Sequence, residues 1–101
     1  MRIVLFGEYS TALSAADCLR GFPITVAGLV NEPRLASLSR FVEDRIVLPE
    51  RSVEQAVRCL ESFKQKTGEK LLLFPCADIW METLSEDLPR VLRIGPMLPA
   101  T

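Results

Sequence analysis

The sequence predicts a doubly wound, three-layer α/β/α domain with a mainly parallel sheet of four or five strands. One observation is a set of short apolar runs, such as RIVLF and KLLLF, which are typical of strands buried on both faces of a sheet. A second is that stretches with helical spacing of apolar residues alternate with these runs, which indicates βαβ units. Right-handed crossovers then place helices on both faces of the sheet.

Each expected strand is an apolar run that stops at a residue unsuited to the interior of a strand. Gly7 ends the first run, Asn31 follows the second, and Pro49 and Pro75 follow the next two. The predicted strands are 2–6, 24–30, 45–48 and 70–74, with a fifth at 91–94, where the short apolar stretch VLRI stands.

Helices are expected between and after these strands, at about 11–20, 33–41, 53–67 and 77–84. The first can take Ser10 or Thr11 as its N-cap, because a hydroxyl accepts a hydrogen bond from the free N–H groups of a first turn. The third has the clearest boundaries. Ser52 and Gln55 form a capping box at its start, and Gly68 closes it.

Composition and charge exclude several classes of function. The 101 residues make one domain with a net charge of −1 and no basic stripe, so neither nucleic acid nor a membrane is expected as a partner. No apolar run reaches the ~20 residues that span a bilayer. The three cysteines are widely spaced, which fits reduced thiols and a cytoplasmic location. Because the chain has no histidine, Ser-His-Asp triads, Cys-His dyads and Cys/His zinc sites are excluded.

Candidate ligand contacts follow the strands, because ligands of doubly wound domains bind outside the carboxyl ends of the strands. Residues Gly7–Thr11, GEYST, lead into a helix whose backbone N–H groups can hold an anion. The alternative is an ordinary turn capped by Ser10 or Thr11, since the G-x-G-x-x-G and Walker A patterns are absent. After the second strand, Asn31 or Glu32 either contacts a ribose or belongs to a solvated turn.

The stretch PCAD at 75–78 leaves two interpretations of its carboxylate open. Asp78 is either a clamp for an ammonium, hydroxyl or metal-bound group of a ligand, or a cap on the first turn of the next helix. Cys76 stands at the same helix start, where a thiol can be activated, but without a histidine the role of a small buried hydrophobe is favoured. Trp80 and Met81 are expected in the core or against another domain.

Two stretches also carry a family resemblance. LASLSRFVEDRIVLPE is similar to S-R-F/Y-V-x-x-x-I/V-x-L-P, and LLLFPCADIWMETLS is similar to L-L/F-x-P/T-x-x-D-x-x-V/M-x-x-L/I-S. Both patterns are those of carbamoyl-phosphate-synthase-like ATP-grasp ligases, in the domain that precedes the ATP-grasp domain. The resemblance extends from Arg2 to about Pro99. It implies a Rossmann-like pre-ATP-grasp domain at 1–95, with 96–101 as the start of a linker.

This resemblance implies a carboxylate–amine ligase, in which ATP phosphorylates a carboxylate and an amine attacks the acyl phosphate. ATP and Mg²⁺ are then expected in an ATP-grasp domain, in cis or as a separate subunit, with no cofactor and no catalytic residue in this chain. The loops 7–11 and 75–78 would form one wall of the substrate cleft. The implied substrate-binding residues are Gly7, Ser10, Thr11, Asp78, which matches the recurrent acid of the family, and Arg40, which matches its Ser-Arg pair.

Two other interpretations stay open. The start MRIVLFG, followed by a helix and by NEP, resembles the formyltransferase fold, but the lack of histidine leaves only a degenerate, inactive member. The chain is otherwise a non-catalytic Rossmann-like binding or interaction module. In the ligase interpretation, an apolar face around Trp80, Met81 and residues 96–99 is expected where a second domain packs, and without that domain a homodimer is expected.

Overall fold

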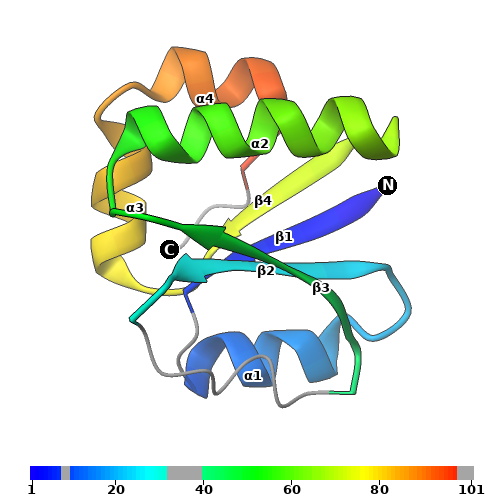
Figure 1. The fold of residues 1–101 in the computed structure, drawn as a ribbon. Coiled ribbons are helices and arrows are strands. Elements are labelled where there is room, and N and C mark those ends of the chain that lie inside the picture. Colours follow the sequence, from blue (N-terminus) through cyan, green and yellow to red (C-terminus); the bar gives the residue numbers. More distant parts are fainter. Residues whose placement is uncertain (8–9, 32–39, 98–101) are drawn as a thin grey trace.

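The computed structural model describes residues 1–7, 10–31 and 40–97. Along the chain the elements are β1 (Arg2–Phe6), α1 (Ser10–Cys18), β2 (Ile24–Leu29), β3 (Val42–Leu48), α2 (Val53–Thr67), β4 (Leu71–Pro75), α3 (Asp78–Ser85) and α4 (Leu88–Ile94). The strands form one sheet in the order β3-β2-β1-β4, and every neighbouring pair is parallel (Figure 1). The predicted α/β fold with a parallel sheet is therefore confirmed.

Helices cover both faces of this sheet (Figure 1). Val4 and Phe6 of β1 point to the face covered by α2, α3 and α4, whereas Ile3 and Leu5 point to the face covered by α1. This division follows from the alternation of side chains along a strand. The largest buried side chain is Trp80 of α3, whose ring centroid lies 5.4 Å from that of Phe6. Trp80 is thus a core residue.

The boundaries of α2 are those expected from its sequence. Ser52 has extended backbone angles, and its Oγ accepts a hydrogen bond from the backbone N–H of Gln55 at 3.2 Å. At the other end, Gly68 adopts the left-handed conformation with a φ of 68°, and its N–H donates to the carbonyl of Lys64 at 2.8 Å. These bonds satisfy helix-end groups that would otherwise lack a partner.

The expected fifth strand at 91–94 is wrong, because these residues form the end of helix α4. Val91 and Ile94, three positions apart, are both buried against the α2 side of the domain, while Leu92 and Arg93 between them are exposed. Pro89 lies in the first turn, where its missing N–H costs nothing. A stretch of only four residues fits the repeat of a strand as well as that of a helix. Packing against α2 and α3 therefore decides that it is helical.

After α4 the chain turns back onto the sheet. A Cβ built on Gly95 would lie 2.1 Å from the carbonyl oxygen of Leu71, so only glycine fits there. The N–H of Leu73 then donates to the carbonyl of Pro96 at 2.9 Å, and Met97 forms an isolated parallel bridge with Leu73. The start of the predicted linker therefore contacts β4, and residues 98–101 lie outside the described part of the chain.

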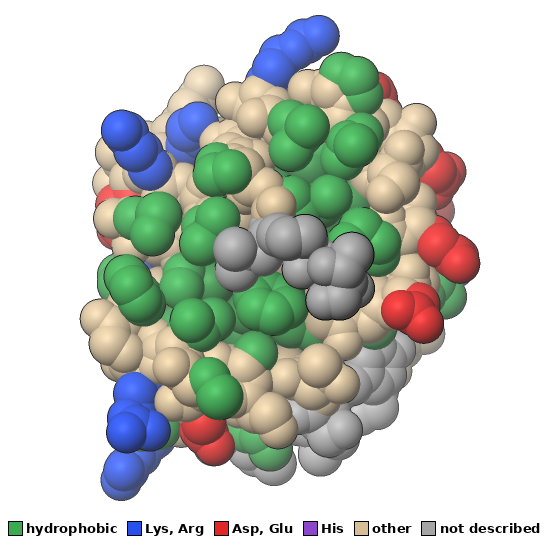
Figure 2. Space-filling view, turned by 180° about the vertical axis from the view of Figure 1, so that it is seen from behind, with side chains coloured by type: hydrophobic (Ala, Val, Ile, Leu, Met, Phe, Trp, Pro, Cys, Tyr) green, Lys and Arg blue, Asp and Glu red, His purple; other side chains and the backbone are tan. Residues whose placement is uncertain are grey.

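The expected exposed apolar face needs a correction, because Trp80 is fully buried and Met81 is half-buried. The exposed apolar residues of α3 and α4 are instead Ile79 and Leu92, which are 38% and 47% exposed. Figure 2 shows hydrophobic side chains gathered over much of the rear of the domain. Self-association through such a face stays a prediction.

Two further expectations concern the middle of the chain. The helical turn predicted at 33–41 falls mostly outside the described residues, and its described end, Arg40 and Phe41, is a turn. Strand β3 begins at Val42, three residues before the start that the sequence suggests. In the described part of the chain, no helix is both long enough and apolar enough to cross a membrane.

Candidate functional site

The carboxyl ends of β1 and β4 form the switch point of the sheet. The chain adds β2 and β3 on one side of β1 and then crosses back to place β4 on the other side. Phe6 and Pro75 are register partners at the ends of the two strands, and the N–H of Cys76 donates to the carbonyl of Phe6 at 3.0 Å. Loops that leave a parallel sheet at such a point diverge, which is where these folds bind ligands.

Gly7 lies at this edge with a backbone that only glycine adopts readily. Its φ is 107°, it is buried, and its N–H donates to the carbonyl of Ala27 at 2.8 Å. Helix α1 begins at Ser10, and Thr11 in its first turn is exposed to solvent. Since Ser10 is already helical, neither hydroxyl residue occupies the N-cap position, which falls among residues outside the described ranges.

Asp78 lies at the same edge as the first residue of α3 and is exposed. The N-cap residue is Ala77, which has extended backbone angles and makes no side-chain capping bond. Asp78 thus lies in the first turn, as the interpretation of a carboxylate on the helix dipole expects, although it does not occupy the N-cap position itself. Its carboxylate belongs to the first turn, where it faces the positive end of the helix dipole and stays open to a ligand.

The Cys76 thiol is buried beside β1 and packs in the core cluster on the α1 face. Burial raises the pKa of this thiol to about 12, although the backbone of Phe6, acting on the thiol, lowers it in part. The Sγ lies 3.5 Å from the carbonyl oxygen of Phe74, to which it donates. The burial of Cys76 in this cluster confirms the packing role, and the raised pKa of the thiol disfavours a thiolate nucleophile.

Arg40 does not join the other candidate residues. It comes just before β3, at the amino end of a parallel strand, and so lies at the opposite edge of the sheet from Gly7 and Asp78. Its guanidinium carbon stands 5.1 Å from the centre of the Phe41 ring, as in a cation–π contact. The tertiary structure thus gathers Gly7, Thr11 and Asp78 around one edge and leaves Arg40 out. Asn31 follows β2 and is exposed, and Glu32 lies outside the described residues.

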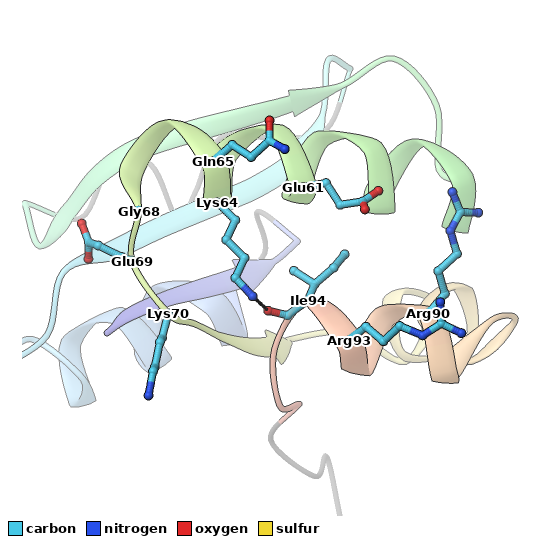
Figure 3. A pocket seen from close by; sticks show the side chains of 9 residues that line it. All are labelled: Glu61, Lys64, Gln65, Gly68, Glu69, Lys70, Arg90, Arg93 and Ile94. Carbon is cyan, nitrogen blue, oxygen red and sulfur yellow. Dashed lines mark hydrogen bonds between the residues drawn. The ribbon is translucent and has the colours of Figure 1, made fainter.

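A hollow in the described part of the chain lies at the amino end of β4, away from the switch point. It encloses about 510 Å³ between α2, α4 and the turn before β4. Its lining residues are Glu61, Lys64, Gln65, Gly68, Glu69, Lys70, Arg90, Arg93 and Ile94 (Figure 3). Sequence reasoning missed this hollow, because one of its walls is the helix that was expected to be a strand. The only feature of the sequence that could have indicated the hollow is the set of cations near the ends of the two helices.

The fold and the edge around Gly7 and Asp78 define the class: a doubly wound α/β domain with a loop edge suited to ligands. Comparison with protein-family models, with curated proteins and with solved structures finds no match for this chain. Within residues 1–7, 10–31 and 40–97, no group of three or more acidic or thiol side chains gathers in a way that could hold a metal ion.

Proposed function

We propose that this chain is the substrate-side, N-terminal domain of an ATP-dependent carboxylate–amine ligase of the ATP-grasp class, without catalytic activity by itself. The observation that carries the proposal is the edge where Gly7 and residues 75–78 lie side by side. These are the two loops that the family resemblance assigns to the wall of the substrate cleft. ATP and Mg²⁺ would bind in an ATP-grasp domain, in cis or on a separate cytoplasmic subunit.

In this proposal Asp78 contacts the substrate rather than the reacting phosphate. Its carboxylate is exposed, and no hydrogen bond or ion pair within the described structure occupies it. It is therefore free to accept a hydrogen bond from an ammonium or hydroxyl group of a substrate that spans two domains. Such a charge-assisted bond is worth about 1.5–3 kcal/mol when one partner is ionised.

The test begins with the gene region beyond codon 101 and with neighbouring reading frames, in which an ATP-grasp domain is expected. The protein that combines both domains should release ADP only when the carboxylate and amine are present. Asp78→Ala should lower kcat/KM by about tenfold or more, the equivalent of one charged hydrogen bond. Glu82→Ala is the matched control, because this exposed carboxylate of α3 lies one turn beyond the edge.

The chain alone gives a second test. With Mg-ATP it should show no change in melting temperature, since a ligand that binds the native state raises stability in proportion to its affinity. A shift equivalent to micromolar binding would place the nucleotide in this domain and contradict the proposal. So would the lack of any ATP-grasp domain in the gene or beside it.

The second candidate is a non-catalytic Rossmann-like binding or interaction module. The hydrophobic side chains gathered on the rear of the domain favour it, because contiguous exposed apolar patches mark interaction sites in soluble proteins (Figure 2). Replacement of Asp78 distinguishes the two candidates. In a ligase domain the substitution lowers the rate of turnover, whereas in an interaction module it leaves the binding of the partner unchanged.

A further inference from the structure

The hollow between α2 and α4 combines concave shape with an excess of unpaired positive charge. Its volume of about 510 Å³ lies in the range of small-molecule sites, roughly 300–1,000 Å³. Figure 3 shows Lys64 reaching from α2 toward α4, with Glu61 on the α2 side and Arg93 on the α4 side of the gap. These side chains come from segments about 30 residues apart in the sequence, as the bond between Lys64 and Ile94 illustrates.

Two of the charges that line the hollow are neutralised by partners outside it. Arg90 makes two hydrogen bonds with the Glu54 carboxylate, which lowers the pKa of that carboxyl group. Glu69 pairs with Arg2 at 3.2 Å. The other charged residues of the lining are three cations, Lys64, Lys70 and Arg93, and one carboxylate, Glu61. This local excess stands out in a chain whose net charge is −1.

Two carbonyl groups at the rim have partners within the protein. Lys64 donates from Nζ to the carbonyl of Ile94 at 2.6 Å, and the N–H of Gly68 donates to the carbonyl of Lys64 at 2.8 Å. The Lys64 ammonium places a positive charge at the negative end of α4, which favours the approach of an anion there. The Lys64 ammonium keeps further N–H donors, because an ammonium carries three.

We infer that the α4 side of this hollow binds a small dianion, a phosphate monoester or a dicarboxylate, at Arg93, with Lys64 contributing its charge from the α2 side. Arg93 is exposed in the last turn of α4, and no partner within the described structure occupies its guanidinium. A guanidinium fork matches the two oxygens of either group, and the Lys64 ammonium adds a compact charge. Lys70, at the rim, raises the local potential. The site lies at the amino ends of the strands, so it is independent of the proposed ligase edge.

The test follows the amide signals of Gln65 and Gly68 in ¹⁵N-labelled protein during titration with inorganic phosphate and, separately, with succinate at constant ionic strength. We expect saturable shifts with at least one dianion. The dianion that binds more tightly indicates whether the ligand is a phosphate monoester or a dicarboxylate. Arg93→Gln should weaken binding by about tenfold, as expected for the loss of one charged hydrogen bond. Raising the salt concentration should also weaken it.

Lys66→Gln is the matched control. Lys66 lies in the same last turn of α2 and carries the same charge, but it lines a different hollow beside Ile46 and Phe63. This variant should bind the dianion within about twofold of the wild type, because a distant exposed charge is screened. Equal losses for Lys66→Gln and Arg93→Gln would overturn the inference, as would shifts that chloride alone reproduces or that fail to saturate. Arg93 is exposed, so its replacement leaves the fold intact and the comparison valid.

Discussion

The backbone N–H of Cys76 donates to the carbonyl of Phe6 at 3.0 Å, which ties the end of β4 to the end of β1. This bond continues the β1–β4 ladder one residue beyond the strand and holds the loop before Asp78 against Gly7. The same position buries the Cys76 thiol. The β1–β4 ladder, with this bond at its end, thus brings together two loops that lie almost 70 residues apart, as the pairing of Phe6 with Pro75 shows.

Asp78→Ala in this chain should have little effect on folding. The carboxylate is exposed and makes no capping bond, so only its interaction with the helix dipole is lost. We expect the free energy of unfolding to fall by about 0.3–1 kcal/mol, measured by urea denaturation. A loss well above that range would reveal a structural contact of Asp78 and weaken its assignment as a substrate contact.

Native Cys76 should resist alkylation at pH 8, because burial keeps its pKa near 12 and its thiol protonated. Iodoacetamide should label the exposed Cys18 first, as detected by mass spectrometry of peptides. Unfolding in guanidinium chloride supplies the control, in which Cys18, Cys59 and Cys76 should all react. Labelling of native Cys76 at the rate of Cys18 would contradict the buried position.

The raised pKa of Cys76 also predicts a loss of stability in alkali. The folded thiol holds its proton up to about pH 12, whereas the unfolded thiol loses it near its ordinary value of 9.0. Between these values the folded state binds more protons, so the free energy of unfolding falls as the pH rises. The contribution of the buried, protonated thiol to the free energy of unfolding is fully present below pH 9. In Cys76→Ala this part of the pH dependence should vanish, whereas Cys18→Ala should retain it.

Gly68→Ala should destabilise the domain by about 1 kcal/mol, because alanine adopts a φ of 68° only with strain. Gly21→Ala is a close control. Both glycines have open space where a Cβ would stand, but Gly21 has no positive φ. The control should leave stability unchanged or raise it by about 0.4–1 kcal/mol. Equal effects of the two variants, measured by thermal unfolding, would show that backbone conformation does not decide the outcome.

Gly95→Ala should disturb the return of the chain to the sheet. The added Cβ would meet the Leu71 carbonyl at 2.1 Å, and that backbone group belongs to the buried first residue of β4. We expect a destabilisation of about 1–3 kcal/mol, as for overpacked sites. Hydrogen exchange gives a local measure, because the Leu73 amide donates to Pro96 and should exchange faster. Unchanged exchange at Leu73 would show that the turn absorbs the methyl group.

Much of the fold could be predicted from local signals. Strands β1 and β4 are continuous apolar runs, and α2 carries its own start and stop residues in Ser52 and Gly68. Helix α4 could not be predicted in this way, because VLRI fits both a strand and a helix. The hollow that depends on α4 was missed for the same reason.

The candidate site, like the fold, has features that follow from local sequence and features that do not. Local signals are enough to predict that Gly7 and Asp78 follow strands of a parallel sheet, because apolar runs and the residues that end them are local properties. The three-dimensional fold is needed to show that β1 and β4 are neighbours, that Arg40 stands at the opposite edge and that Cys76 is buried. These facts depend on strand order and on packing between distant segments, and no short stretch of sequence contains either.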